Sequence, residues 1–290
     1  MNFSIRYLTE YAYDAPVADN LNVLRVRPAT TSTQRCDEFS VRVDPEARIS
    51  RHLDYFGTEV IEFGVAKPHD HLTIDVRARV VTGDSPEPPE QAWDDLASDR
   101  YRLAGGEFLL PTGDEPEEAE EIDELAGQLS DEPTPLAAVT ALADLIPDRF
   151  AYDQDATYVG STVEDLLAAR GGVCQDFVHL GLILLRRRGI AARYVSGYLW
   201  AAPQDGGSDS LEVQTHAWLE ALLPGEREPA WVGVDPTNRR LVGETHVKVG
   251  HGRRYSDVPP IKGVYAGSAS SHLGAHVTLS RLDPETSARP

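Results

Sequence analysis

The chain has 290 residues, and its 47 acidic against 27 basic side chains give a formal net charge of −20. That charge argues against nucleic acid or an anionic membrane as a partner, because both are bound by basic surfaces. Two cysteines are too few for a disulfide framework. The first residues lack the charged start and apolar core of a signal peptide, so we expect a cytoplasmic protein.

Residues 1–83 predict an antiparallel β-sandwich-like domain. Short segments rich in Val, Ile, Phe and Tyr alternate polar and apolar side chains, and Pro, Asp and Gly separate them. No helical period interrupts these segments, which is typical of an all-β arrangement. The proline-rich segment 83–93 follows. Because such a segment is stiff and extended, we interpret it as a boundary that few contacts cross, so the N-terminal domain should be separable.

Residues 84–160 are predicted to be a linker and a helical lead-in to a second domain. Within 114–129, apolar residues recur at i, i+3, i+4 and i+7, so this acidic stretch predicts an exposed amphipathic helix rather than a disordered tract. A more apolar helix is predicted over 135–150. A third helix should begin at Ser161, because Ser161 and Glu164 have the spacing of a capping box.

Cys174 follows the pair Gly171–Gly172, with Val173 between them, and precedes a strongly apolar run. A free cysteine is commonly a small buried core residue, which is the plainer interpretation. The glycine pair, however, ends the preceding helix and permits a sharp turn, so Cys174 should lie in the first turn of a new helix. There the dipole and unpaired N–H groups favour a thiolate and can receive an oxyanion. We therefore predict that Cys174 is a nucleophile.

Three strands are predicted after this helix, over 191–200, 215–223 and 230–236. The second domain is therefore predicted to be α+β, with its helices packed on a mostly antiparallel sheet. The last residues, 283–290, are predicted to be a loose tail.

His216 is the predicted base and Asp235 its carboxylate partner. His216 shares one strand face with Trp218 and Glu220, and the alternative is the half-exposed polar face of an edge strand. Asp235 ends the next strand before Pro236, where the alternative is an ordinary turn. A nucleophile on a helix, followed by a histidine and a carboxylate on strands, has the order of the papain-type Cys–His–Asn/Asp triad.

The remaining histidines give weaker signals. His179 lies five residues after Cys174, which is ~140° around a helix, so it is interpreted as a structural or surface histidine. His69 and His71 share a strand face and could bind a metal, but the neighbouring sequence supplies no further ligands. Four others lie in sequence rich in Gly and Ser and give no signal alone: His246, His251, His272 and His276.

Four stretches within residues 170–238 together resemble the bacterial transglutaminase-like cysteine protease family: RGGVCQDFVHL, GIAARYVSGYL, THAWLEALLPG and WVGVDPTN. The N-terminal stretch resembles the β-rich domain that precedes this catalytic core. GRRYSDVPPIKGVYAG, at 252–267, resembles the family's closing motif, although Arg254 stands where the family usually has Asp. The resemblance implies the same nucleophile, base and carboxylate: Cys174, His216 and Asp235.

The resemblance also implies the domain plan and the activity. It implies an N-terminal β domain at 1–83 and a papain-like transglutaminase core at 161–282. The implied reaction cleaves a peptide, isopeptide or related amide through a thioester, with the Cys174 backbone N–H in the oxyanion hole. Trp218 and Tyr198 are expected to line the cleft, and no metal or organic cofactor is implied. Acyl transfer to an amine and a catalytically silent binding or scaffold protein stay open as alternatives, and the oligomeric state is not predicted.

Overall fold

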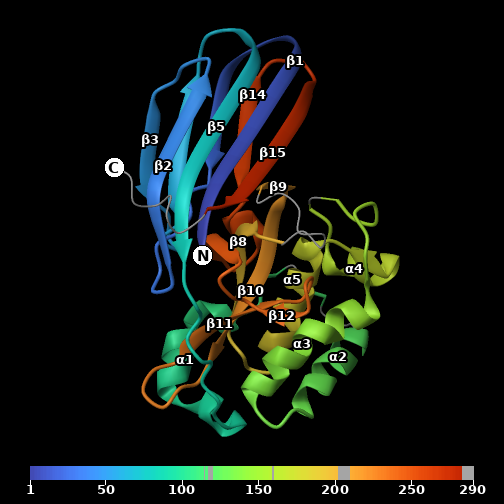
Figure 1. Ribbon diagram of the computed structural model, residues 1–290. Helices are drawn as coiled ribbons and strands as arrows, with labels where there is room; N and C mark the ends of the chain where they lie inside the picture. The colour runs from blue at the N-terminus through green and yellow to red at the C-terminus, as the bar shows by residue number, and fades with distance from the viewer. Residues whose placement is uncertain (114, 117–119, 159, 202–209, 283–290) are drawn as a thin grey trace.

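Two main β-sheets organise the structure, a computed structural model that describes residues 1–113, 115–116, 120–158, 160–201 and 210–282. One sheet has eight strands and the other five, and the larger helices lie beside the five-stranded sheet (Figure 1). The predicted fold class, an antiparallel β domain followed by an α+β papain-like core, is confirmed. Among the helices of these ranges, none is long and apolar enough to cross a membrane.

The eight-stranded sheet is built around one long strand, β1, which curls so that both of its halves are paired. Its strands are β1 (Asn2–Leu24), β2 (Gln34–Asp44), β3 (Ile49–Leu53), β4 (Glu59–Val65), β5 (His69–Thr82), β9 (Ser210–Val213), β14 (Ile261–Ala266) and β15 (Ser271–Arg281). The first half of β1 pairs with β5 and β15, and the second half with β4 and β14. Apolar side chains of both halves, such as Phe3 and Leu24, are buried in one core.

The C-terminal strands β14 and β15 lie beside β1 in this N-terminal sheet (Figure 1). Val277 pairs with Tyr7 and Leu279 with Ile5, and all four side chains are buried in the core of that sheet. The range 161–282, predicted to be the catalytic core, therefore includes strands that hydrogen-bond to the N-terminal sheet. Strands that pair are often distant in sequence, and the alternation within one strand does not indicate its partner.

The two sheets share an apolar core. Tyr198 and Val247 of the five-stranded sheet, and Trp200 directly after β8, are buried among N-terminal side chains. The rings of Phe3 and Trp200 have centroids 6.0 Å apart. The prediction that few contacts join the parts on either side of segment 83–93 is therefore wrong. The proline-rich composition correctly describes a segment without helix or strand over 83–92, but it carries no information about what packs around it.

The five-stranded antiparallel sheet has the order β12-β11-β10-β8-β13. Its strands are β8 (Ala192–Leu199), β10 (Thr215–Leu223), β11 (Ala230–Asp235), β12 (Arg240–Leu241) and β13 (His246–Gly252). Because β10 lies between β11 and β8, the alternative of an edge strand at 215–223 is wrong.

Four helices share the apolar core of this sheet: α2 (Glu120–Ser130), α3 (Pro135–Arg149), α4 (Val163–Ala169) and α5 (Cys174–Arg187). α5 packs closely on β10, since a Cβ on Gly181 would lie 2.6 Å from Leu219 Cδ2. The shorter elements are η1 (Trp93–Ala97), α1 (Asp99–Gly105), η2 (Gly106–Leu109), β6 (Ala151–Tyr152), β7 (Gly171–Gly172) and η3 (Tyr255–Asp257).

Two of the predicted helices differ from the structure at their first residues. α2 begins at Glu120, its predicted apolar stripe is buried, and residues 114 and 117–119 of the predicted range lie outside the described residues. The capping box of α4 is formed by Thr162 and Asp165, where Thr162 Oγ1 accepts from the Asp165 N–H at 3.3 Å. The predicted Ser161–Glu164 pair is therefore wrong by one residue. The Ser161 hydroxyl instead accepts from the Tyr158 N–H at 3.0 Å.

Candidate active site

Cys174 is the first residue of α5 and follows a turn that requires glycine. The glycine pair before it forms β7, and a Cβ on Gly172 would lie 2.7 Å from Asp176 Oδ2. That carboxylate accepts hydrogen bonds from the Val173 N–H at 2.9 Å and from the Thr157 hydroxyl at 2.6 Å. The Asp176 carboxylate thus holds the turn before Cys174 in place. Cys174 itself lies at the N-terminus of α5, and its side chain is partly exposed.

His216 lies at the start of β10, between a carboxylate and the thiol. Its Nε2 donates to Asp235 Oδ2 at 2.8 Å, and Cys174 is a second side-chain hydrogen-bond partner. Since Nε2 faces Asp235, Nδ1 is the ring nitrogen left for Cys174. Burial alone would lower the pKa of His216, but hydrogen bonds and charges of Asp235 and Cys174 outweigh burial and raise that pKa to about 9. The imidazole is therefore positively charged at neutral pH.

Asp235 is the last residue of β11, and its side chain is fully buried. Besides His216, the side-chain amide of Asn238 donates to Oδ2 at 2.8 Å, and His246 Nε2 lies 3.1 Å from the same oxygen. The Asn238 backbone N–H donates to Oδ1 at 3.2 Å. Burial would raise the pKa of Asp235, but the hydrogen bonds from both histidines outweigh it and hold this pKa well below the ordinary range. The carboxylate is thus ionised and fixed in orientation.

Two of these contacts were missed in the sequence. Asn238 lies three residues after Asp235, and its side chain reaches back across the turn. The DPTN motif contains this spacing, but the same motif is equally typical of an ordinary turn. His246 begins β13, which pairs with β8 on the far edge of the sheet. No local pattern relates His246 to Asp235, because only the folding of the chain brings them together.

A cleft of about 710 Å³ opens at Cys174 and His216. Aromatic side chains line part of it, namely Tyr152, Tyr194 and Tyr255, and most of its other lining residues are polar or small. Val213, the last residue of β9, and the following Gln214 also line the cleft, so the N-terminal sheet supplies part of the cleft wall. Within the described residues, none of the side chains lining this cleft is a carboxylate, a lysine or an arginine.

Tyr198 and Trp218, expected in the cleft, lie elsewhere. Tyr198 is 1 % exposed, and its hydroxyl donates to the Val26 carbonyl at 3.1 Å in the core between the sheets. Trp218 is also 1 % exposed and lines a different cavity with Gln34 of the N-terminal sheet. Strand alternation indicates which residues share a face, but not which other element covers that face. Both expectations are therefore corrected.

Glu220, the third residue on the His216 face, has a structural role. It is paired with Arg193 at 2.6 Å and with Lys248 at 2.6 Å. Burial opposes ionisation, but these two cations outweigh it and lower the pKa of Glu220 to about 2. The polar face of β10 is therefore an internal ion-pair network rather than a solvated surface.

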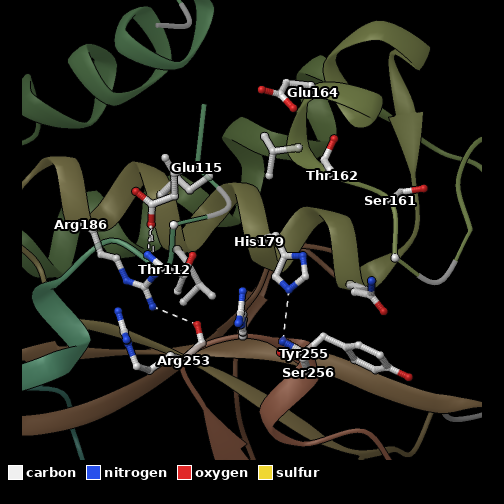
Figure 2. Close-up of a pocket in the computed structure, with 17 residues that line it drawn as sticks. Thr112, Glu115, Ser161, Thr162, Glu164, His179, Arg186, Arg253, Tyr255 and Ser256 are labelled. Carbon is white, nitrogen blue, oxygen red and sulfur yellow. Dashed lines mark hydrogen bonds and ion pairs between the residues drawn. The ribbon is translucent and has the colours of Figure 1, made fainter. Parts of the chain in front are cut away.

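A second cavity has a volume of about 570 Å³ (Figure 2). Gln175 and Tyr255 line both cavities. His179 points across this cavity, and its Nε2 accepts from the Tyr255 N–H at 3.3 Å, which agrees with a structural histidine (Figure 2). Arg254 lines the same cavity, and its backbone N–H donates to Asp257 Oδ2 at 3.3 Å.

The histidine pair considered for a metal is not brought together. His69 is buried and contacts the Lys67 carbonyl and the Asn20 amide, whereas His71 is exposed and contacts Asp70. Among the described residues, no group of three or more His, Cys, Asp or Glu side chains could hold a metal ion.

Comparison with known proteins places two family models on the chain. The bacterial transglutaminase-like N-terminal region matches residues 3–81, and the transglutaminase-like superfamily core matches residues 123–236. The chain is 35 % identical to an uncharacterized protein of Mycobacterium leprae, over 94 % of this chain and 96 % of that one. It is 34 % identical to an uncharacterized protein of Mycobacterium tuberculosis, over 96 % and 92 % of the two chains.

Two further similarities bear on fold and on the core. A crystal structure from Cytophaga hutchinsonii, named as a candidate cysteine protease, superposes with a TM-score of 0.71 at 24 % identity, covering 98 % of this chain and 92 % of that one. This likeness shows the fold. A protein-glutamine gamma-glutamyltransferase of Pseudomonas aeruginosa is 34 % identical over 108 residues, which are 36 % of this chain and 16 % of that protein.

Proposed function

The chain belongs to the bacterial transglutaminase-like family, and from this premise we propose that it is a cysteine-dependent acyl hydrolase with Cys174, His216 and Asp235 as its triad. The observation that carries the proposal is the placement of His216, with Nε2 2.8 Å from Asp235 and Cys174 as its other side-chain partner. The proposed substrate is a peptide, an isopeptide or a related amide. A cytoplasmic location stays a prediction.

In the first half of the proposed reaction, the Cys174 thiolate attacks the carbonyl carbon of the amide. The carbonyl oxygen becomes an oxyanion, which the Cys174 backbone N–H at the α5 N-terminus stabilises. His216, charged at neutral pH, gives its proton to the amide nitrogen as the C–N bond breaks. An amine leaves, and a thioester links the acyl group to Cys174.

In the second half, neutral His216 removes a proton from water, and the resulting hydroxide attacks the thioester carbon. The C–S bond breaks, the carboxylic acid leaves, and His216 again carries the proton beside the Cys174 thiolate. Asp235 is not protonated in either half. It holds the imidazole in one tautomer and orientation, as the buried Asp of a serine triad does.

Water is the proposed acceptor because none of the described side chains that line the cleft is a carboxylate that would attract a protonated lysine. Asp235 is fully buried behind His216. The similarity of the core to a gamma-glutamyltransferase favours the second candidate, transfer of the acyl group to an amine. The retained nucleophile, base and carboxylate argue against a silent scaffold.

Acylation with p-nitrophenyl acetate tests the triad without knowledge of the natural substrate. Intact-mass and peptide mass spectrometry at pH 7 should find one acetyl group, on Cys174, and Cys174→Ser should abolish it. Cys36→Ser is the matched control and should react like the wild type. Acetylation of Cys36, or a Cys174→Ser variant that acetylates like the wild type, would reject the proposal.

The acceptor is tested by adding excess methylamine to the same reaction. Acetate should remain the main product. A predominance of N-methylacetamide would favour the transferase. Trapping an acyl-enzyme from cell extract and identifying its acyl group by mass spectrometry would name the substrate.

A further inference from the structure

His246 contacts the triad carboxylate although the proposed triad does not include it. It is 4 % exposed, and its Nε2 lies 3.1 Å from Asp235 Oδ2. His216 Nε2 reaches the same oxygen at 2.8 Å. Two imidazoles, with ring centroids 6.4 Å apart, therefore share one carboxylate oxygen.

The surroundings of His246 determine which of its nitrogens carries the proton. The Gly243 N–H donates to His246 Nδ1 at 3.4 Å, and the Thr245 hydroxyl lies 3.4 Å from the same nitrogen. A ring nitrogen that accepts a hydrogen bond carries no proton, so neutral His246 has its proton on Nε2. Nε2 is the nitrogen that faces Asp235, and His246 is therefore a donor to the carboxylate.

The charges around His246 favour its neutral form. Burial is the strongest influence, and together with the nearby charges of Arg240 and His216 it outweighs the attraction of Asp235 and lowers the pKa of His246. The Trp218 ring covers His246 in a T-shaped contact with centroids 5.3 Å apart. The two histidines on Asp235 thus differ in charge, since His216 is an imidazolium at neutral pH and His246 is not.

We propose that His246 is a positioning residue that, as a neutral Nε2–H donor, holds Asp235 Oδ2 toward His216. This inference rests on the proposed triad. A neutral donor stabilises the buried carboxylate without adding a second positive charge beside the His216 imidazolium. A charged His246 would instead place an Nδ1–H against the Gly243 N–H, two donors that cannot bond to each other.

Three variants separate a donor role from a packing role. His246→Gln keeps an N–H donor near the position of Nε2, His246→Asn keeps an amide that is too short to reach, and His246→Leu keeps bulk without a donor. Hydrolysis of p-nitrophenyl acetate should fall ~10-fold or more in the Leu and Asn variants, as expected for a lost hydrogen bond to a charged group. The Gln variant should stay within about threefold of the wild type, since its donor replaces the imidazole N–H.

Equal rates in the Gln and Asn variants would overturn the proposal, and so would a Leu variant as fast as the wild type. If the Leu variant does not fold, as checked by thermal unfolding, the Gln–Asn pair decides. A second readout is ¹⁵N NMR of the wild-type imidazoles at pH 7. His246 should be neutral and protonated on Nε2 while His216 is charged. A charged His246, or a proton on its Nδ1, would also overturn the proposal.

Failure of the proposed role of His246 can be distinguished from failure of the proposed triad. The acetyl group on Cys174 and its loss in Cys174→Ser test the proposed function alone. If those results hold while His246→Leu and His246→Asn match the wild type, only the role of His246 is rejected.

Discussion

Replacing His216 by alanine should change how alkylation of Cys174 by iodoacetamide depends on pH. The pKa of His216 is raised from 6.5 to about 9, which corresponds to roughly 3 kcal/mol in favour of the imidazolium form. Hydrogen bonds and charges of Asp235 and Cys174 cause this rise in pKa. Part of the free energy therefore comes from the interaction between the imidazolium and the Cys174 sulfur. An unpartnered thiol has a pKa of ~8.5 and is only about 1 % thiolate at pH 6.5, whereas a thiol paired with an imidazolium is largely ionised.

The expected change in rate is smaller than the change in thiolate population. A thiol that is fully ionised by the proposed ion pair would exceed an unpartnered thiol in thiolate population by ~100-fold at pH 6.5, but a thiolate of low basicity is a weaker nucleophile, which removes about twentyfold of that advantage. The net difference at pH 6.5 is therefore only about fivefold. The slope is more telling: the variant's rate should fall ~tenfold for each pH unit below 8, while the wild-type rate should change little between pH 6.5 and 8.

Cys36 is the internal control for this experiment. Its thiol donates to the Glu38 carbonyl at 3.4 Å, and burial, opposed by Arg27, raises its pKa. Peptide mass spectrometry of both cysteines in one sample gives the two rates under identical conditions. Cys36 should show the steep pH dependence in wild type and variant alike. If the alkylation rate of Cys174 depends on pH in the same way in the wild type and in His216→Ala, the ion pair is refuted. Cys174 would then be interpreted as a core residue.

Three further outcomes are expected. Asp235→Asn should leave Cys174 open to alkylation but reduce p-nitrophenyl acetate turnover by up to ~10⁴-fold, the loss known for the corresponding change in a serine triad; unchanged turnover would exclude an orienting role. Gly172→Ala should destabilise the fold by about 1–3 kcal/mol in urea titrations, because its Cβ would lie 2.7 Å from Asp176 Oδ2. Protease cleavage within 83–93 should leave the two fragments associated on gel filtration, because Phe3 and Trp200 share one core; their separation would contradict that core.

The stabilising contribution of His216 should also depend on pH. Its folded pKa is raised above the unfolded value of 6.5, so this contribution is complete below pH 6.5 and is lost as pH rises through about 9. The difference in unfolding free energy between wild type and His216→Gln, measured in urea at several pH values, should therefore be larger at pH 6 than at pH 10. A difference that grows with pH would show that the sign is wrong.

The sequence predicted those parts of the site that depend on local pattern. Cys174 follows a glycine pair and precedes an apolar run, so its place at a helix N-terminus follows from a few adjacent residues. His216 and Asp235 lie on strands whose alternation is plain in the sequence. These strands are neighbours in the sheet, and Leu219 pairs with Val234, so the hairpin between them brings the two residues together.

The sequence could not predict the contacts that depend on what covers a strand. Trp218 is on the predicted face of β10, yet that face is closed by other side chains, including His246. His246 reaches Asp235 only because β13 adds to the edge of the sheet beside β8. Both errors have the same physical origin, since periodicity determines the direction of a side chain and leaves its tertiary neighbours undetermined.

The return of the chain to β1 has a consequence for biosynthesis. β1 is synthesised before two of its partners, β14 and β15, which span residues 261–281. Until these partners are made, β1 has unpaired N–H and C=O groups along both of its halves, and such groups can pair with other chains. Closure of the N-terminal sheet is therefore expected to follow translation of the catalytic core, so this domain cannot mature independently during synthesis. A nascent chain stalled before residue 261 should expose that edge to chaperones and proteases.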